Sequence, residues 1–527
     1  MSYFDFHLHP TLKSMFSEAD NKTNPWENID IKKIPWILRW CTDFEYILGS
    51  QANLKMIQEA RAVLVCIALY VPEKGISSSK LILDQAKGTL QTYLNPKRLE
   101  KINNGTLKPY PDLIMEDLDV LLHPEKFGLP NKKVIPLGKD VPYDENARDT
   151  IYVVFSIEGC HSISDTLDKN KMNPDELIEN LNKLRAKIPL ISINLTHLEQ
   201  YPLCNHAYGI QFVSTEDFKP TGDRITNGGL KLIEHCYKNN ILIDLKHMSL
   251  AARRMFIESL RKSKDLSKNL QPLICSHGAF TGISYSDIPD YINAQKVSGK
   301  KFSYLLWGKP KKYEMLDFFT SFNPSSINLY DEDILAIINS DGLIGLSLDK
   351  RILGYTDSTN RSPNLNELAF EEEYISNAEK DVYFTKRRLG KKMTDFHCIT
   401  TQEVMQGGVV LPRIGFYHLC HFMQQVLHYM KVVIDNKYDF EKALTQLCIG
   451  SDFDGIIDPV WCCPNVGSLH DLKTQFKQSF NSFAGNNSAM VKLPRSFNVN
   501  RFAEQLFYEN GRAFVQKRIQ ALYPPNK

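Results

Sequence analysis

Eight short apolar runs alternate with longer amphipathic stretches along this chain of 527 residues, and this alternation constrains the fold more than any other feature. The runs are almost continuously apolar and contain many β-branched residues, which is typical of parallel strands that are buried on both faces. Helix candidates precede the fourth to seventh runs, and eight such strand–helix units predict an α/β protein, a (β/α)8 TIM barrel. The runs lie at residues 2–9, 61–71, 150–159, 188–197, 239–249, 271–278, 341–349 and 444–455, and the helix candidates at residues 173–187, 226–238, 249–263 and 330–340.

Two spacings between the runs are too long for a simple strand–helix unit. We therefore expect insertions at about residues 71–149 and 349–445, and a C-terminal extension at about residues 459–527. Residues 364–392 are highly charged and predict a solvated helical insertion. A long amphipathic stretch before the last run and another near the end of the chain, residues 416–434 and 501–522, predict helices. No linker or internal repeat divides the chain, so we expect one elaborated domain spanning residues 1–527.

Composition and charge narrow the function classes. The net charge of +2, without a sustained basic stripe, gives no reason to expect nucleic acid or a membrane surface as a partner. The longest apolar run, residues 62–71, is too short to cross a bilayer, and the N-terminus lacks a basic region followed by an apolar stretch. We expect a soluble, cytoplasmic protein. Its 11 cysteines have no regular spacing, and those inside apolar runs, such as Cys66, Cys275 and Cys448, predict reduced core residues.

Polar residues with metal-binding or proton-transfer chemistry stand at the ends of most of these runs. In a barrel of this kind the C-terminal strand ends meet at one mouth, so residues far apart in sequence converge there. The histidines of the first run occupy alternate positions of a strand and would share a face. The candidate residues are His7, His9, Glu158, His197, His247, His277 and Asp452.

The number and type of these candidates indicate two metal ions. Four or more imidazoles and two carboxylates exceed the needs of one four-coordinate ion, and a carboxylate can bridge two ions. Ligation by histidine and carboxylate without cysteine suits Zn²⁺, and it does not exclude Mn²⁺, Fe²⁺ or Co²⁺. We expect two divalent metal ions as cofactors, with zinc favoured.

Six short motifs resemble, in the same order, the strand ends of the membrane (renal-type) dipeptidase family within the amidohydrolase superfamily. They are "DFHLHP", "FSIEGCHSIS", "INLTHLEQYP", "LIDLKHMS", "PLICSHGA" and "IGSDFDG". The resemblance implies a binuclear zinc hydrolase that cleaves amide or peptide bonds with a hydroxide bridging the two ions. It also implies the following roles: His7, His9 and Asp452 hold one ion, His247 and His277 hold the other, Glu158 bridges them, and His197 positions the scissile carbonyl and stabilises its oxyanion.

Asp452, beside the ions and the nucleophile, is the candidate that takes the proton of the attacking water and delivers it to the leaving amine. His161 is predicted to be structural, and His418 and His421, which share a face of a predicted helix and could bind metal, are predicted instead to have a helix-packing or surface role. The first strand departs from the family pattern, because family members read His-x-Asp there and this chain reads His-x-His.

A second departure concerns the substrate. In the family, an arginine on the loop after the sixth strand pairs with the terminal carboxylate of the substrate. This chain has no arginine between Arg261 and Arg351. Arg351 or Lys296 could replace it from another direction. We therefore expect a small-molecule or short-peptide substrate that need not be a simple dipeptide with a free carboxylate, and a homodimer is left open.

Two alternative functions are also compatible with the sequence. A phosphoesterase of the polymerase-and-histidinol-phosphatase type also opens with a His-x-His strand and binds several metals, but such proteins usually close with an Asp-x-His pair, whereas this chain reads "SDFDG". The second alternative is a barrel that retains its ligands and binds metal without catalysis. Metal content together with a screen for amide hydrolysis distinguishes the three.

Overall fold

The computed structural model describes residues 2–13, 24–29, 44–79, 84, 96–104, 109–166, 168–209, 218–262, 264–288, 292–296, 304–308, 322–354, 373–383, 396–398 and 413–523. Each of the eight apolar runs contains one parallel strand of a single sheet. In sheet order these strands are β1 (Tyr3–Leu8), β2 (Ala62–Leu69), β4 (Thr150–Ile157), β5 (Leu190–Asn194), β6 (Leu242–Asp244), β7 (Ile274–Gly278), β10 (Leu343–Leu346) and β12 (Leu447–Ile449).

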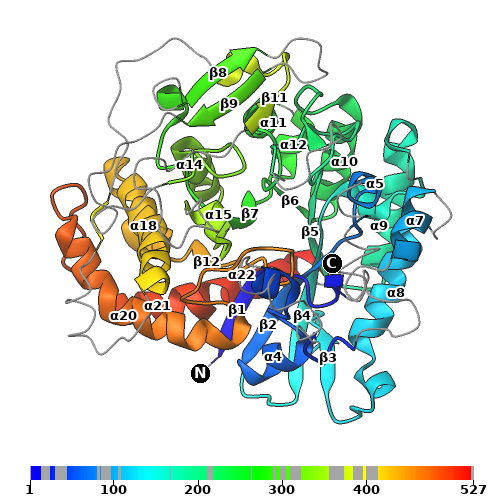
Figure 1. The fold of residues 1–527 in the computed structure, drawn as a ribbon, viewed down its shortest axis with the longest axis horizontal. Helices are drawn as coiled ribbons and strands as arrows, with labels where there is room; N and C mark the ends of the chain where they lie inside the picture. Colours follow the sequence, from blue (N-terminus) through cyan, green and yellow to red (C-terminus); the bar gives the residue numbers. More distant parts are fainter. Residues whose placement is uncertain are drawn as a thin grey trace.

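The first and last strands meet and close the sheet into a barrel (Figure 1). Leu8 forms a parallel bridge with Phe453, and the His9 N–H donates to the Phe453 carbonyl at 2.9 Å. The Asp452 N–H in turn donates to the His7 carbonyl at 2.9 Å. The predicted (β/α)8 barrel is confirmed, and its closure brings the loop after the last strand against the end of the first.

Helices cover the outside of the barrel, and all four helix candidates, which precede the fourth to seventh runs, are confirmed. Two of them begin at a capping side chain: the Asn173 side chain accepts from the Asp175 N–H, and the Thr226 hydroxyl accepts from the Gly229 N–H. Leucines and isoleucines of these helices pack on outward-facing strand residues in one large core cluster. The four helices are α9 (Pro174–Arg185), α10 (Asn227–Lys238), α11 (Leu250–Lys262) and α14 (Asp331–Asn339).

The first insertion contains helices, as its length led us to expect, and one strand that the sequence did not predict. Strand β3 (Lys133–Pro136) pairs in parallel with the first half of β4, while β5 pairs with the second half. A four-residue strand ending in proline is too short to show a strand-like pattern in sequence. The helices described in this part of the chain and before it are α3 (Phe44–Leu48), α4 (Leu54–Glu59), α5 (Lys74–Ser78), α7 (Pro96–Asn103) and α8 (Tyr110–Leu122).

A small antiparallel sheet, also not predicted, is formed by β8 (Ile292–Lys296), β9 (Tyr304–Gly308) and β11 (Glu373–Ile375). The prediction of a solvated helical insertion at residues 364–392 is wrong for its described part, residues 373–383. This part begins with β11 and ends with the short helix α16 (Lys380–Tyr383), and Glu373 is 1% exposed. Within residues 373–383, the charged composition reflects carboxylates that are buried and hydrogen-bonded. The other residues of the predicted insertion lie outside the described part of the chain.

The C-terminal extension packs against the closing strands. Its last predicted helix, residues 501–522, consists of α21 (Val499–Glu504), a π-helical turn (Gln505–Glu509) and α22 (Asn510–Leu522). The Asn510 amide donates to the carbonyls of Leu444 and Leu447, both at 2.7 Å, just before and within β12. The other α-helices of the described residues are α12 (Lys264–Lys268), α15 (Lys350–Leu353), α18 (Arg413–Asp435), α19 (Phe440–Leu444) and α20 (Leu469–Asn486).

Two further features concern membrane-spanning helices and the cysteines. In the part of the chain that the structure describes, no helix is both long and apolar enough to cross a membrane. Cys66, Cys275 and Cys448 are buried thiols outside any disulfide, as predicted. The division into one domain with two insertions and an extension stays a prediction.

Candidate metal centre

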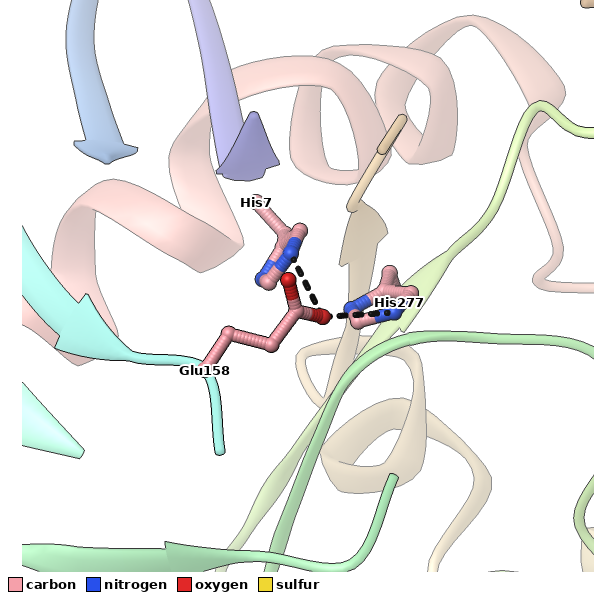
Figure 2. A group of neighbouring side chains, drawn as sticks. All are labelled: His7, Glu158 and His277. Carbon is pink, nitrogen blue, oxygen red and sulfur yellow. Dashed lines mark ion pairs between the residues drawn. The ribbon is translucent and has the colours of Figure 1, made fainter. Parts of the chain in front are cut away.

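One buried carboxylate, that of Glu158, lies at the centre of a group of imidazoles at the C-terminal mouth of the barrel. Its Oε1 atom is 3.1 Å from Nε2 of His247, 3.3 Å from Nε2 of His7 and 3.5 Å from Nε2 of His277. Figure 2 shows His7 and His277 turned toward this carboxylate from different strands. Glu158 follows β4 directly, and its N–H donates to the Leu69 carbonyl at the end of β2, which fixes its place at the strand ends.

The other oxygen of Glu158 faces the second histidine of the first strand. Oε2 of Glu158 is 3.1 Å from Nε2 of His9, and Nε2 of His9 is 3.5 Å from Oδ1 of Asp452. Nε2 of His7 lies 3.8 Å from the same Asp452 oxygen. The alternate positions of His7 and His9 therefore place both rings on one face, as the His-x-His spacing predicted, with their Nε2 atoms 3.1 Å apart.

Two of the site residues have left-handed backbone conformations, which are costly for residues other than glycine. The φ angle is 68° at His247 and 65° at Asp452. The loop around Asp452 also leaves room for its carboxylate: a Cβ atom on Gly455 would lie 2.2 Å from Oδ1 of Asp452. Strained backbone at these positions is consistent with side chains that are aimed at a shared point.

The donor set fits divalent cations. Nε2 of His247 and Nε2 of His277 are 3.2 Å apart, as close as the pair on the first strand. Burial holds the pKa values of His247 and His277 well below the usual range, so both rings carry a free lone pair. Several imidazole lone pairs that face one another and a carboxylate are an arrangement that a cation stabilises.

The ring nitrogens on the far side, the Nδ1 atoms, differ in their partners. Nδ1 of His277 contacts the Ser276 hydroxyl at 2.9 Å, while Nδ1 of His7, His9 and His247 is buried without a hydrogen-bond partner among the described residues. Among the described residues, three groups of side chains have ligand atoms close enough together to hold an ion: His7–Glu158–His277, His7–His9–Asp452 and Glu158–His197–His247.

Exposure divides the seven site residues into two groups. The side chains of His7, His9, Glu158, His247 and His277 are between 0% and 6% exposed. Those of His197 and Asp452 are 10% and 16% exposed. The latter two are thus the most accessible from the mouth, and all seven residues predicted from sequence come together.

The three histidines predicted to have roles other than metal binding each contact the backbone. Nε2 of His161 lies 2.7 Å from the Val71 carbonyl, Nδ1 of His418 accepts from the Trp461 N–H, and Nδ1 of His421 lies 2.8 Å from the Tyr417 carbonyl. None of the three belongs to the candidate metal groups found among the described residues.

Sequence reasoning missed a residue next to the centre, Glu73, which lies after β2. Its Oε1 atom is 2.6 Å from Nδ1 of His197 and accepts from the Leu198 N–H at 3.2 Å, and its Oε2 atom accepts from the Tyr70 hydroxyl. Burial would raise the pKa of Glu73, but the imidazoles of His197 and His161 and the hydrogen bonds lower it to about 2. Glu73 is the only acidic residue between Arg61 and Asp84, and that was the available signal.

Comparison with solved structures identifies a protein with a similar fold. A metallopeptidase from Rhodobacter sphaeroides, solved with a phosphinate mimic of the dipeptide L-Ala-D-Ala, is 13% identical, with a TM-score of 0.51 over 98% of this chain and 99% of that chain. The chain has the fold of this metallopeptidase. The resemblance suggested by the six motifs is therefore confirmed at the level of the fold.

Two other solved structures are less similar. A dipeptidase AC, described as a metallopeptidase of family M19, is 14% identical over 98% of both chains with a TM-score of 0.48. A probable dipeptidase PvdM from Pseudomonas aeruginosa is 13% identical over 89% of this chain and 90% of that chain, with a TM-score of 0.44. No family model and no curated protein sequence matches the chain.

Proposed function

We propose that this protein is a dipeptidase-like hydrolase that uses two divalent metal ions, with zinc favoured, to cleave amide or peptide bonds. The observation that carries the proposal is the convergence of four imidazole Nε2 atoms on Glu158 at the mouth of the barrel, 3.1 to 3.5 Å from its oxygens. His7, His9 and Asp452 would hold one ion, His247 and His277 the other, and Glu158 would bridge them. The likeness to a metallopeptidase structure supports the fold on which this chemistry would operate.

Bound divalent ions would supply a water of lowered pKa and positive charge near a polarised carbonyl. The protein's own residues supply proton transfer and orientation. Asp452, partly exposed at the mouth, would accept a proton from the attacking water and donate it to the leaving amine. Nε2 of His197, 3.7 Å from Glu158, would donate a hydrogen bond to the developing oxyanion.

The absence of an arginine after the sixth strand still bears on the substrate. Arg351 is engaged by Asp349: Nε of Arg351 donates to both carboxylate oxygens, at 3.0 and 3.1 Å, and Nη2 donates at 2.6 Å. A guanidinium held this way already has its bidentate partner. We therefore propose short-peptide or small amide substrates for which a free terminal carboxylate is not required.

The test is a metal analysis followed by a hydrolysis screen. Two ions per chain and turnover of dipeptides or simple amides support the proposal, whereas turnover of phosphoesters alone identifies a phosphoesterase. Bound metal without any turnover identifies a catalytically silent barrel.

Comparing a dipeptide with its C-terminal amide then tests the substrate class. We expect similar kcat/KM values for the two. A strong preference for the free acid that survives both Arg351→Ala and Lys296→Ala would show that another group binds the carboxylate.

A further inference from the structure

The loop after β2 supplies a carboxylate that holds His197 from behind. The side chain of Glu73 is fully buried, with an exposure of 0%, and that of His197 is 10% exposed. The two residues are 124 positions apart in sequence, yet Nδ1 of His197 and Oε1 of Glu73 are only 2.6 Å apart. A contact of this length between an imidazole N–H and a carboxylate is a charge-assisted hydrogen bond.

Three donors meet at this one carboxylate. Besides the His197 ring, the Leu198 N–H and the Tyr70 hydroxyl donate to Glu73. Because the backbone N–H of the next residue binds the same oxygen as the ring, the carboxylate is tied to the loop that carries His197. The ring of Tyr70 also packs edge-on against the His197 ring, with centroids 4.8 Å apart.

These contacts occupy Nδ1 of His197 and fix the direction in which the other ring nitrogen, Nε2, points. With its Nδ1–H bound to Glu73, the ring presents Nε2 to the metal centre, 3.7 Å from Oε1 of Glu158, and a doubly protonated ring has its second N–H there. The His197 ring lies edge-on to the His247 ring, at a centroid distance of 4.3 Å. Rotation of the ring would break the buried hydrogen bond and leave the carboxylate with an unsatisfied lone pair.

We propose that Glu73 is a positioning residue: its carboxylate accepts the Nδ1–H of a doubly protonated His197 ring and thereby sets the orientation that directs the second N–H, at Nε2, toward the reacting carbonyl. The inference rests on the proposed amide hydrolysis for its kinetic consequences, but the hydrogen bond itself can be tested independently. Outer partners of this kind typically change activity by about 10- to 100-fold when they are replaced.

The first experiment follows the shared proton without any substrate. A proton in a short, buried imidazole–carboxylate hydrogen bond gives a low-field resonance in the proton NMR spectrum. We expect such a resonance in the wild-type protein, its loss in both Glu73→Gln and His197→Gln, and its retention in Glu199→Gln. Glu199 is a matched control because it is another buried carboxylate, which accepts from the Gly75 N–H in the same pair of loops.

The second experiment is a double-mutant cycle on kcat and KM. Glu73→Gln is expected to lower kcat by about 10- to 100-fold with little change in KM, and to have almost no further effect in a His197→Gln background. Glu199→Gln is expected to retain wild-type kinetics. Equal costs of Glu73→Gln in both backgrounds would mean that Glu73 only supports the fold, which overturns the proposal.

The two experiments separate the possible failures. If Glu73→Gln does not fold, the wild-type spectrum and that of His197→Gln still decide, because a wild type without a low-field resonance that depends on His197 contradicts the proposal. If the protein hydrolyses no amide, the proposed function fails, while the resonance still reports whether Glu73 holds His197.

Discussion

Replacing Glu158 by glutamine tests the central element of the site, the shared carboxylate. Oε1 of Glu158 faces His247 at 3.1 Å and Oε2 faces His9 at 3.1 Å, so its two oxygens point at imidazoles of both proposed ligand sets. A neutral amide preserves the shape of the side chain but removes the charge. We therefore expect Glu158→Gln to weaken both metal ions together.

The size of the effect follows from the burial of the carboxylate. Glu158 is 2% exposed, so water screens its charge poorly. At an effective dielectric constant of about 20, two unit charges about 4 Å apart interact by about 4 kcal/mol. Because a divalent ion carries twice the charge used here, and about 1.4 kcal/mol corresponds to a factor of ten, loss of the carboxylate charge should raise the dissociation constant of each ion by at least about a thousandfold.

Metal titration against a chelator of known affinity measures both dissociation constants, and elemental analysis gives the number of ions retained. Glu199→Gln removes a buried carboxylate nearby and should retain both ions. If Glu158→Gln lost one ion and held the other with wild-type affinity, Glu158 would belong to a single ion. If both affinities stayed unchanged, it would not be a ligand.

Three further changes test other parts of the structure. Asp452→Asn should lower kcat by about 10²- to 10⁴-fold with a much smaller change in KM, measured by steady-state kinetics, and near-normal turnover would remove Asp452 from proton transfer. Lys246→Met should raise the free energy of unfolding by about 1 to 3 kcal/mol in denaturant titrations. The reason is that Nζ of Lys246 is buried without a hydrogen-bond partner among the described residues. A loss of stability in this variant would contradict the prediction. Burial raises the pKa values of Glu373 and Glu379 to about 7 from 4.5, so the folded state binds more protons than the unfolded state between these values, and stability is lost as the pH rises. Each pKa shift corresponds to about 3 kcal/mol of stability. The variant with both Glu373→Gln and Glu379→Gln should therefore lose less stability between pH 5 and pH 8 than the wild type. Parallel curves of the free energy of unfolding against pH for the two proteins would show that both carboxyls titrate normally.

The sequence alone was sufficient to predict the barrel and the positions of the seven residues at its mouth. Every apolar run contains a strand, because a parallel strand buried on both faces needs an unbroken apolar stretch and that requirement is local. The positions of Glu158 and Asp452 could be predicted for the same reason, since they follow strands whose C-terminal ends must meet in a closed parallel barrel. The spacing of His7 and His9 places both rings on one face without any knowledge of the rest of the chain.

Only the tertiary structure decided what surrounds these residues. The contact between Glu73 and His197 joins two loops 124 residues apart, and no periodicity in either loop encodes it. The burial of Glu373, in a segment whose charge predicted a solvated helix, depends on Ser326, which donates its N–H to that carboxylate at 3.1 Å. Hydrophobic periodicity records which face of an element is buried, whereas the partner of a buried polar group is set by whichever distant loop the closed barrel brings within hydrogen-bonding distance.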